Sequence, residues 1–165
     1  MRYGQIRQYD VANGEGIRTS VFVTGCTHAC KNCFNEEYQD FSSGEPWSDA
    51  QTELVVQYLS DPCVAGLTLL GGEPFQNTKD LLPVVRTIRS RVSKSIWVYS
   101  GYTFEELLQD EEKIALLSLC DVLVDGRFVE EKKDLTLRFR GSSNQRLIDV
   151  KQSLQEGRPV LLEQR

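Results

Sequence analysis

Short apolar runs and amphipathic helical segments alternate four times along the chain. The runs are rich in β-branched and aromatic residues, which favour strands, and the segments between them repeat apolar residues at helical spacing. Alternation of this kind predicts an α/β fold, a parallel sheet with covering helices. The runs that we expect to form strands are 20–24, 66–70, 95–99 and 121–124.

The expected helices have recognisable starts and stops. Ser48 with Gln51 and Thr103 with Glu106 form the capping-box pattern, and the apolar face after Thr103 continues to about Leu119. The Ser, Gly and Pro of 40–48 indicate a surface loop before the first of these helices. Further helices are expected over 77–92 and 151–156, the second of them stopped by Gly157.

Two weaker strand patterns follow the last of the four runs. Residues 135–140 alternate apolar and polar side chains, which predicts a half-exposed strand, and 146–150 is another short candidate. The chain has 165 residues, with neither a flexible linker nor an internal repeat. We therefore expect a single domain over 1–165.

Each unusual segment comes directly after a predicted strand. A cysteine-rich loop follows the first strand, and 71–74 (GGEP), 99–102 (YSGY) and 125–128 (DGRF) follow the other three. Ligand sites of parallel α/β folds lie at the carboxyl ends of the strands. We therefore expect the four loops to converge on one cavity.

Three of the five cysteines fall within eight residues. Cys26, Cys30 and Cys33 have the spacing C-x3-C-x2-C, whereas Cys63 and Cys120 stand apart and are expected to be buried as small apolar residues. An odd number of cysteines cannot all pair, and a disulfide framework belongs to small secreted chains. A tight thiol cluster in a reducing compartment indicates metal or redox chemistry.

The spacing favours an iron–sulfur cluster over zinc. A structural zinc site takes four ligands, and a Cys3His site with His28, the only histidine, would have to close 26, 28 and 30 together. Soft thiolates suit an iron–sulfur cluster, and three of them leave one iron of a four-iron cluster open. A small zinc-binding structural module is the alternative from another functional class.

Charge and hydropathy limit the partners. The net charge of −5 argues against nucleic acid, no apolar run reaches membrane-spanning length, and the N-terminus lacks the apolar core of a signal peptide. We therefore expect a cytoplasmic protein without nucleic-acid or membrane partners. The basic side chains are concentrated after residue 125, and they could dock a protein partner at the cavity mouth. They include Arg127, Lys132, Lys133, Arg138 and Arg140.

The motifs in this order resemble the radical S-adenosylmethionine enzymes. The resemblance rests on C-x3-C-x2-C after the first strand and Gly-Gly-Glu-Pro after the second. Further segments resemble the glycyl-radical-enzyme activases, and together those that activate anaerobic (class III) ribonucleotide reductase. They are 13–18 (NGEGIR), 97–102 (WVYSGY), 122–128 (VLVDGRF) and 140–145 (RGSSNQ), so that the resemblance covers about residues 1–146.

The resemblance implies a fold and an activity. The fold is a partial, open β/α barrel with about five to six mostly parallel strands and outer helices. A [4Fe-4S] cluster reductively cleaves S-adenosylmethionine to a 5′-deoxyadenosyl radical, which removes hydrogen from a glycine of the large reductase subunit. A low-potential donor such as flavodoxin supplies the electron, and the sequence also allows a homodimer. An activase of a different glycyl radical enzyme is the nearer alternative, although 140–145 and the lack of cysteines for a ferredoxin insert count against it.

The resemblance also assigns residues to the two cofactors. Cys26, Cys30 and Cys33 would ligate the cluster, and no catalytic side chain is needed beyond cluster and cofactor. Gly71 and Gly72 would let the backbone approach the methionine end of S-adenosylmethionine, where Glu73 would accept from its ammonium. The adenine would meet the backbone of Asn32, Cys33 and Phe34, and Asn32 stands where many radical enzymes have an aromatic residue. Ser100 would bind a ribose hydroxyl or the carboxylate, and Asp125 would organise the cavity or bind a cation.

Overall fold

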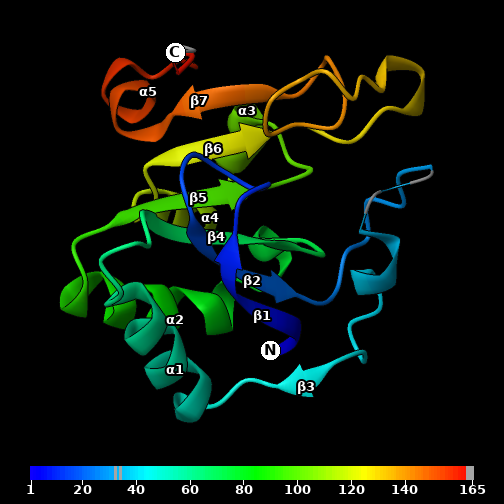
Figure 1. Cartoon of the computed structure of the whole chain (residues 1–165). Helices are drawn as coiled ribbons and strands as arrows, with labels where there is room; N and C mark the ends of the chain where they lie inside the picture. Colours follow the sequence, from blue (N-terminus) through cyan, green and yellow to red (C-terminus); the bar gives the residue numbers. More distant parts are fainter. Residues whose placement is uncertain (32, 34, 163–165) are drawn as a thin grey trace.

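One open, mixed sheet forms the centre of the computed structural model, which describes residues 1–31, 33 and 35–162. Among these residues the sheet has seven strands in the order β3-β1-β2-β4-β5-β6-β7 (Figure 1). The strands are β1 (Arg2–Asp10), β2 (Arg18–Val23), β3 (Glu45–Pro46), β4 (Gly66–Gly71), β5 (Ser95–Tyr99), β6 (Val122–Asp125) and β7 (Arg146–Asp149).

The four strands expected from the apolar runs form the parallel middle of the sheet. β2, β4, β5 and β6 pair parallel in that order, whereas β1, β3 and β7 are antiparallel to their neighbours. The expected five to six strands were too few, because β1 and β3 had no apolar run to mark them. β1 lies near the edge with Arg7, Gln8 and Tyr9 exposed, so its sequence lacks the buried-strand pattern.

Within the described part of the chain, five α-helices and three short 3-10 helices lie between and after the strands. Gln51 accepts from the Ser48 N–H at 2.7 Å, and Thr103 and Glu106 bond reciprocally, as the capping patterns predict. The single face expected after Thr103 is broken in two, because Asp110 caps a new helix through the N–H groups of Glu112 and Lys113. The elements are α1 (Asp49–Leu59), α2 (Thr78–Arg91), α3 (Phe104–Leu107), α4 (Glu111–Leu117), α5 (Val150–Glu156), η1 (Glu36–Tyr38), η2 (Pro74–Gln76) and η3 (Glu130–Lys132).

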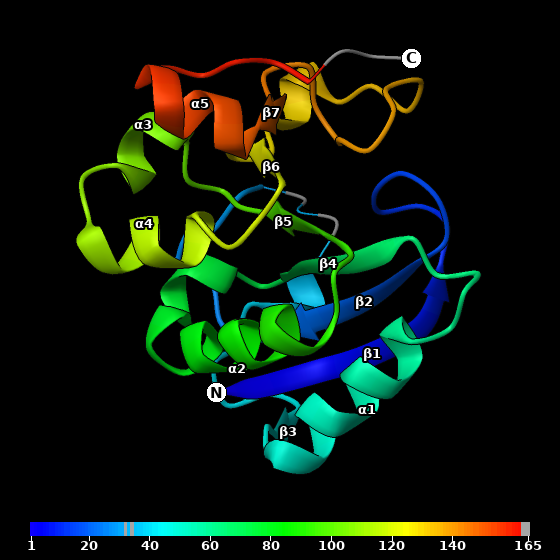
Figure 2. The same ribbon diagram turned by 90° about the vertical axis from the view of Figure 1, so that its left-hand side faces the viewer.

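The two faces of the sheet are covered differently. Helices pack on one face and bury alternate strand residues such as Val21, Leu69 and Val98 in the main core (Figure 2). The intervening residues, among them Leu70 and Tyr99, point to the opposite face, which loops cover. That second face is therefore the one with space for a ligand.

The predicted strand over 135–140 is wrong. These residues form turns and bends, with Leu135 exposed and Phe139 at a φ of +66°. Asp134 Oδ1 accepts from the Thr136 N–H and hydroxyl, and such local bonds compete with a strand ladder. The alternation of apolar and polar residues alone gives no sign of this turn.

The C-terminal segment completes the far edge of the sheet. β7 and α5 form where 146–150 and 151–156 predicted a strand and a helix, and Gly157 ends α5 at a φ of +70°. The chain then returns along β7, where the Leu162 N–H donates to Leu147 O at 2.8 Å. Within the described residues, no helix has the length and apolarity to cross a membrane.

The two isolated cysteines have different environments. Cys120 is buried in the main core, as predicted. Cys63 is exposed, contrary to the prediction, because it sits in the turn after α1, where Asp61 Oδ1 accepts from its N–H at 2.9 Å.

Candidate functional site

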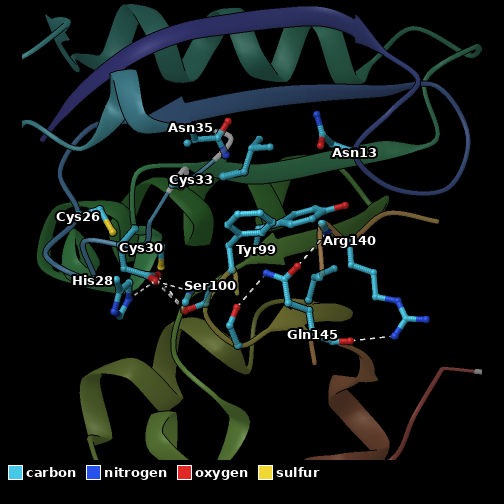
Figure 3. A pocket seen from close by; sticks show the side chains of 18 of the residues that line it. Asn13, Cys26, His28, Cys30, Cys33, Asn35, Tyr99, Ser100, Arg140 and Gln145 are labelled. Atoms are coloured by element: carbon cyan, nitrogen blue, oxygen red, sulfur yellow. Dashed lines mark hydrogen bonds and ion pairs between the residues drawn. The ribbon is translucent and has the colours of Figure 1, made fainter. Parts of the chain in front are cut away.

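A cavity of about 330 Å³ lies on the loop-covered face of the sheet. It is found where β2, β4, β5 and β6 end, and all four strand-end segments contribute to its wall. Cys26, Cys30 and His28 lie at one end of the cavity and Asn13 and Arg140 at the other (Figure 3). The four loops therefore converge on one cavity, as predicted.

The three clustered cysteines are free, half-buried thiols that line this cavity. Burial raises the pKa of Cys26 to about 11 and also raises the pKa of Cys30. The Phe128 N–H and the Arg127 guanidinium act in the opposite direction on the pKa of Cys30. Thiolates in such a setting need a positive centre beside them, which a metal supplies.

The donor set fits an iron–sulfur cluster. Three soft thiol ligands on one irregular loop, with space beside them, match the requirements of a cluster that keeps one iron free of protein. Among residues 1–31, 33 and 35–162, no three His, Cys, Asp or Glu side chains gather around a point where a single metal ion would sit. His28, the fourth ligand of the zinc alternative, uses its Nε2 for Glu73.

Glu73 is the most heavily bonded side chain of the site. Its fully buried carboxylate accepts from His28 Nε2 at 2.7 Å and from Ser100 Oγ at 2.9 and 3.0 Å. The backbone N–H groups of Gly101 (2.7 Å) and Phe75 (3.0 Å) complete the set. The predicted site residues Glu73 and Ser100 therefore lie in direct contact, and Glu73 joins the ends of β4 and β5 to the cysteine loop.

His28 and Gly101 are site residues that the sequence reasoning missed. The His28 ring stands edge-on to Tyr102, with centroids 4.6 Å apart, and its side chain is 6% exposed. A Cβ on Gly101 would lie 2.5 Å from His28 Cδ2, so residue 101 has to be glycine for the ring to fit. The signal available in the sequence was that the only histidine falls between two cysteines.

Gly71 and Gly72 allow the cysteine loop to pack on the turn after β4. Gly71 has a φ of +109°, and a Cβ on Gly72 would lie 2.6 Å from the carbonyl oxygens of Gly25 and Tyr38. The Glu73 N–H donates to Gly25 O at 2.7 Å. The two glycines are therefore needed by the protein's own backbone, whatever the cavity holds.

Asp125 does not enter the cavity. Its buried carboxylate accepts from the Phe104 N–H at 2.8 Å and from Arg146 Nε at 3.0 Å, whereas its neighbours Val124 and Gly126 line the cavity wall. Asp125 thus holds β6 to α3 and β7. Of the other predicted site residues, Asn32 and Phe34 lie outside the described residues.

The far end of the cavity is built from two of the sequence motifs. Thr68 Oγ1 donates to Asn13 O, and buried Arg18 donates to Thr68 Oγ1. These two bonds attach residues 13–18 to β4. Gln145 accepts from Gly141 and donates to Gly126 O, which holds 140–145 against the end of β6. Both motifs therefore shape the wall.

The basic residues expected at the mouth are dispersed. Arg140 lines the cavity, and Arg127 pairs with Glu106 at 3.0 Å. The Arg138 guanidinium lies over the Phe139 ring, 4.7 Å from its centroid. A docking role for these side chains stays a prediction.

The chain is similar to proteins of known activity. A family described as "4Fe-4S single cluster domain" matches residues 12–148. The anaerobic ribonucleoside-triphosphate reductase-activating protein of Haemophilus influenzae is 43% identical over 150 residues, which cover 88% of this chain and 96% of the relative. The proteins of the same name from Pasteurella multocida (41%; 88% and 95% covered) and Escherichia coli K12 (39%; 88% and 96% covered) are similar over the same length.

Proposed function

The chain belongs to the anaerobic ribonucleoside-triphosphate reductase-activating proteins and carries a 4Fe-4S single cluster domain, and on this premise we propose that it is the enzyme that generates the glycyl radical of an anaerobic ribonucleotide reductase. The observation that carries the proposal is the cavity at the strand ends. Three free thiols and the Gly71–Glu73 turn share it, as a cluster and a small cofactor beside it would require.

Cys26, Cys30 and Cys33 would hold the [4Fe-4S] cluster, with S-adenosylmethionine as the second cofactor in the same cavity. When bound, the cluster would supply the electron that cleaves S-adenosylmethionine to methionine and the 5′-deoxyadenosyl radical, which takes a hydrogen atom from the reductase glycine. The protein's part is to hold both groups and to exclude competing reactions. The fold would then be the partial barrel of the radical S-adenosylmethionine enzymes.

The residues around the cofactor would divide its binding among them. Gly71 and Gly72 would face its methionine end, and backbone around Cys33 would face the adenine. Glu73 would accept from the ammonium, although about four acceptor positions of a carboxylate are already shared by His28, Ser100 and two N–H groups. The ammonium would therefore have to share an oxygen of Glu73 with one of these donors.

The protein substrate would close the open side of the cavity. The large reductase subunit is the proposed partner, a low-potential donor such as flavodoxin would reduce the cluster, and the cytoplasm is the proposed compartment.

One experiment tests the activity and its partner together. The protein is reconstituted anaerobically with iron and sulfide, then incubated with S-adenosylmethionine, dithionite and the reductase encoded by the same organism. We expect about four irons per chain and a glycyl doublet in the electron paramagnetic resonance spectrum. One zinc and no sulfide would instead support the structural module, and a doublet only with another glycyl radical enzyme would identify a different activase.

A further inference from the structure

The cysteine loop is tied to the turn after β4 through one side chain, and we propose that His28 is a positioning residue that holds the cluster-binding loop on Glu73. In this role His28 fixes the loop and orients the carboxylate at the same time. The inference deepens the proposed function and rests on it, since it concerns the same cluster and cofactor site.

The contacts of His28 reach the segments that follow β4 and β5. Its Nε2 donates to Glu73 Oε1 at 2.7 Å, its ring stands edge-on to Tyr102, and its ring atoms fill the space left by Gly101. The side chain lies on the segment between Cys26 and Cys30, so it joins the middle of the ligand loop to the ends of β4 and β5 (Figure 3). A rotation of the ring would break all three contacts together.

The carboxylate of Glu73 is oriented in part by this donor. It is fully buried, and His28 Nε2 lies 2.7 Å from its Oε1. A buried carboxylate depends on its hydrogen-bond donors, and His28 supplies the donor that comes from the cysteine loop. Without His28, Oε1 would keep Ser100 and the Gly101 N–H, but the carboxylate would lose its bond to the cysteine loop and one of the donors that fix its orientation.

The backbone after His28 gives an independent reason for an anchor. Ala29 has a φ of +52°, which is a strained conformation for a residue with a side chain. Such strain persists only where neighbouring contacts impose it. The bonds of Thr27 to Gln76 and the His28–Glu73 bond, both directly before Ala29, hold this turn between the ligand positions 26 and 30.

Two substitutions separate the hydrogen bond from the packing. His28→Gln keeps an N–H donor near the position of Nε2 but removes the ring, whereas His28→Phe keeps a ring but removes the donor. His28→Ala removes both. All three leave the cysteines in place, so each variant should still take up the iron of the wild type.

The first measurement uses the cluster-free protein. The three variants are made in a Cys63→Ser background, so that the exposed thiol does not react, and the rate of thiol alkylation is followed. We expect His28→Ala and His28→Phe to react several-fold faster than the parent because the loop opens more often. His28→Gln should stay close to the parent.

The second measurement uses the iron-loaded protein. Because a hydrogen bond to a buried charge is strong, we expect the dissociation constant of S-adenosylmethionine to rise about tenfold in His28→Ala and His28→Phe. It should change less than about threefold in His28→Gln. The change that S-adenosylmethionine causes in the spectrum of the reduced cluster should weaken in the same order.

Gly101→Ala provides a matched control, because its methyl group would meet mainly the His28 ring. It should mimic His28→Ala in the parent and add little in the His28→Ala background. If His28→Phe has the alkylation rate and the S-adenosylmethionine affinity of the parent, His28 acts by packing only and the inference is wrong. If His28→Ala binds S-adenosylmethionine more tightly than the parent, the ring blocks Glu73 and the inference is wrong as well. Full additivity with Gly101→Ala would also overturn the inference, whereas a parent protein that takes up no iron would overturn the proposed function instead.

Discussion

The carboxylate of Asp125 and the guanidinium of Arg146 join the end of β6 to the start of β7 beneath the cavity wall. Arg146 Nε lies 3.0 Å from Asp125 Oδ1, and the pair also raises the pKa of Arg146. Glu105 contacts the outer side of the same guanidinium at 2.8 Å. One arginine therefore has a buried and an exposed acidic partner, which permits a direct comparison.

Asp125→Asn is expected to lower the free energy of unfolding by about 1–3 kcal/mol, since it removes a buried charge partner while the amide oxygen can still accept from Phe104. Glu105→Gln, at the exposed side, should cost less than about 1 kcal/mol. Urea titration at pH 7 measures both. Equal losses in the two variants would contradict the assignment of Asp125 as a structural anchor.

A second prediction concerns pH and the pair formed by Arg127 and Glu106. The hydrogen bond from Arg127 lowers the pKa of Glu106 to about 2. Because the folded pKa lies below the unfolded value, the pair stabilises the protein above about pH 4.5 and this contribution disappears as the pH falls toward 2. Both side chains are 43% exposed, so the effect should be only about 0.5 kcal/mol.

The comparison of the wild type with Glu106→Gln tests this. The difference between their unfolding free energies should be largest near pH 6 and should vanish as the pH falls toward 2. A difference that grows on acidification would have the wrong sign for a carboxylate with a lowered pKa.

The cluster ligands lead to the third prediction. Cys30→Ala should lose the bound iron and, with it, cleavage of S-adenosylmethionine, because two thiolates of the loop cannot hold the cluster in place. Cys63→Ser is the matched control, since Cys63 is exposed and does not line the cavity. Iron and sulfide analysis after anaerobic reconstitution measures the outcome, and a normal cluster in Cys30→Ala would refute the ligand assignment.

The elements that the sequence predicted well are those whose pattern is local. Buried β-branched runs marked the parallel strands, and the Thr103–Glu106 capping box marked the start of α3. β1 was not predicted because it lies near the edge of the sheet and keeps exposed polar side chains, and its pairing with β2 depends on tertiary contact. The turn at 135–140 was predicted as a strand from its alternating apolar and polar residues. The local hydrogen bonds from Thr136 to Asp134 favour a turn there instead.

The candidate site shows the same division. The cysteines and the Gly71–Glu73 turn could be found from spacing and order along the chain. The link between them could not, because His28 and Glu73 are 45 residues apart and meet only through the fold. Asp125 was predicted to serve the cavity because it follows a strand. A residue at a strand end can point to either face of the sheet, and its position in the sequence does not decide which.

The close approach at Gly72 gives the fourth prediction. Gly72→Ala should destabilise the protein by about 1–3 kcal/mol, because the new methyl group would meet backbone oxygens of Gly25 and Tyr38 that cannot move independently. It should also lower iron uptake, since the same backbone begins the cysteine loop. Gly157→Ala at the end of α5 is the control, because it strains a left-handed residue by about 1 kcal/mol but has open space around it. Thermal unfolding and iron content are measured on both, and unchanged iron uptake in Gly72→Ala would contradict the packing argument.

The fifth prediction concerns Arg18, a buried guanidinium that connects three strands. It donates to Thr68 Oγ1 at 2.8 Å and to Leu67 O and Ser95 O at 2.9 Å each. Burial lowers the pKa of Arg18 to about 10, which is still above neutral pH, so the buried guanidinium is charged and needs these acceptors. A lysine ammonium cannot reach the same acceptors in the same fork geometry.

Arg18→Lys is therefore expected to cost about 2–4 kcal/mol of unfolding free energy, because it leaves buried carbonyl groups unpaired. Arg7→Lys, at a half-exposed position on β1, should change the stability by less than about 0.5 kcal/mol. Since Thr68 also bonds to Asn13 O, Arg18→Lys should loosen 13–18 as well, which hydrogen exchange of its amides would detect. Stability lost without faster exchange in 13–18 would mean that Arg18 braces the sheet but not the cavity wall.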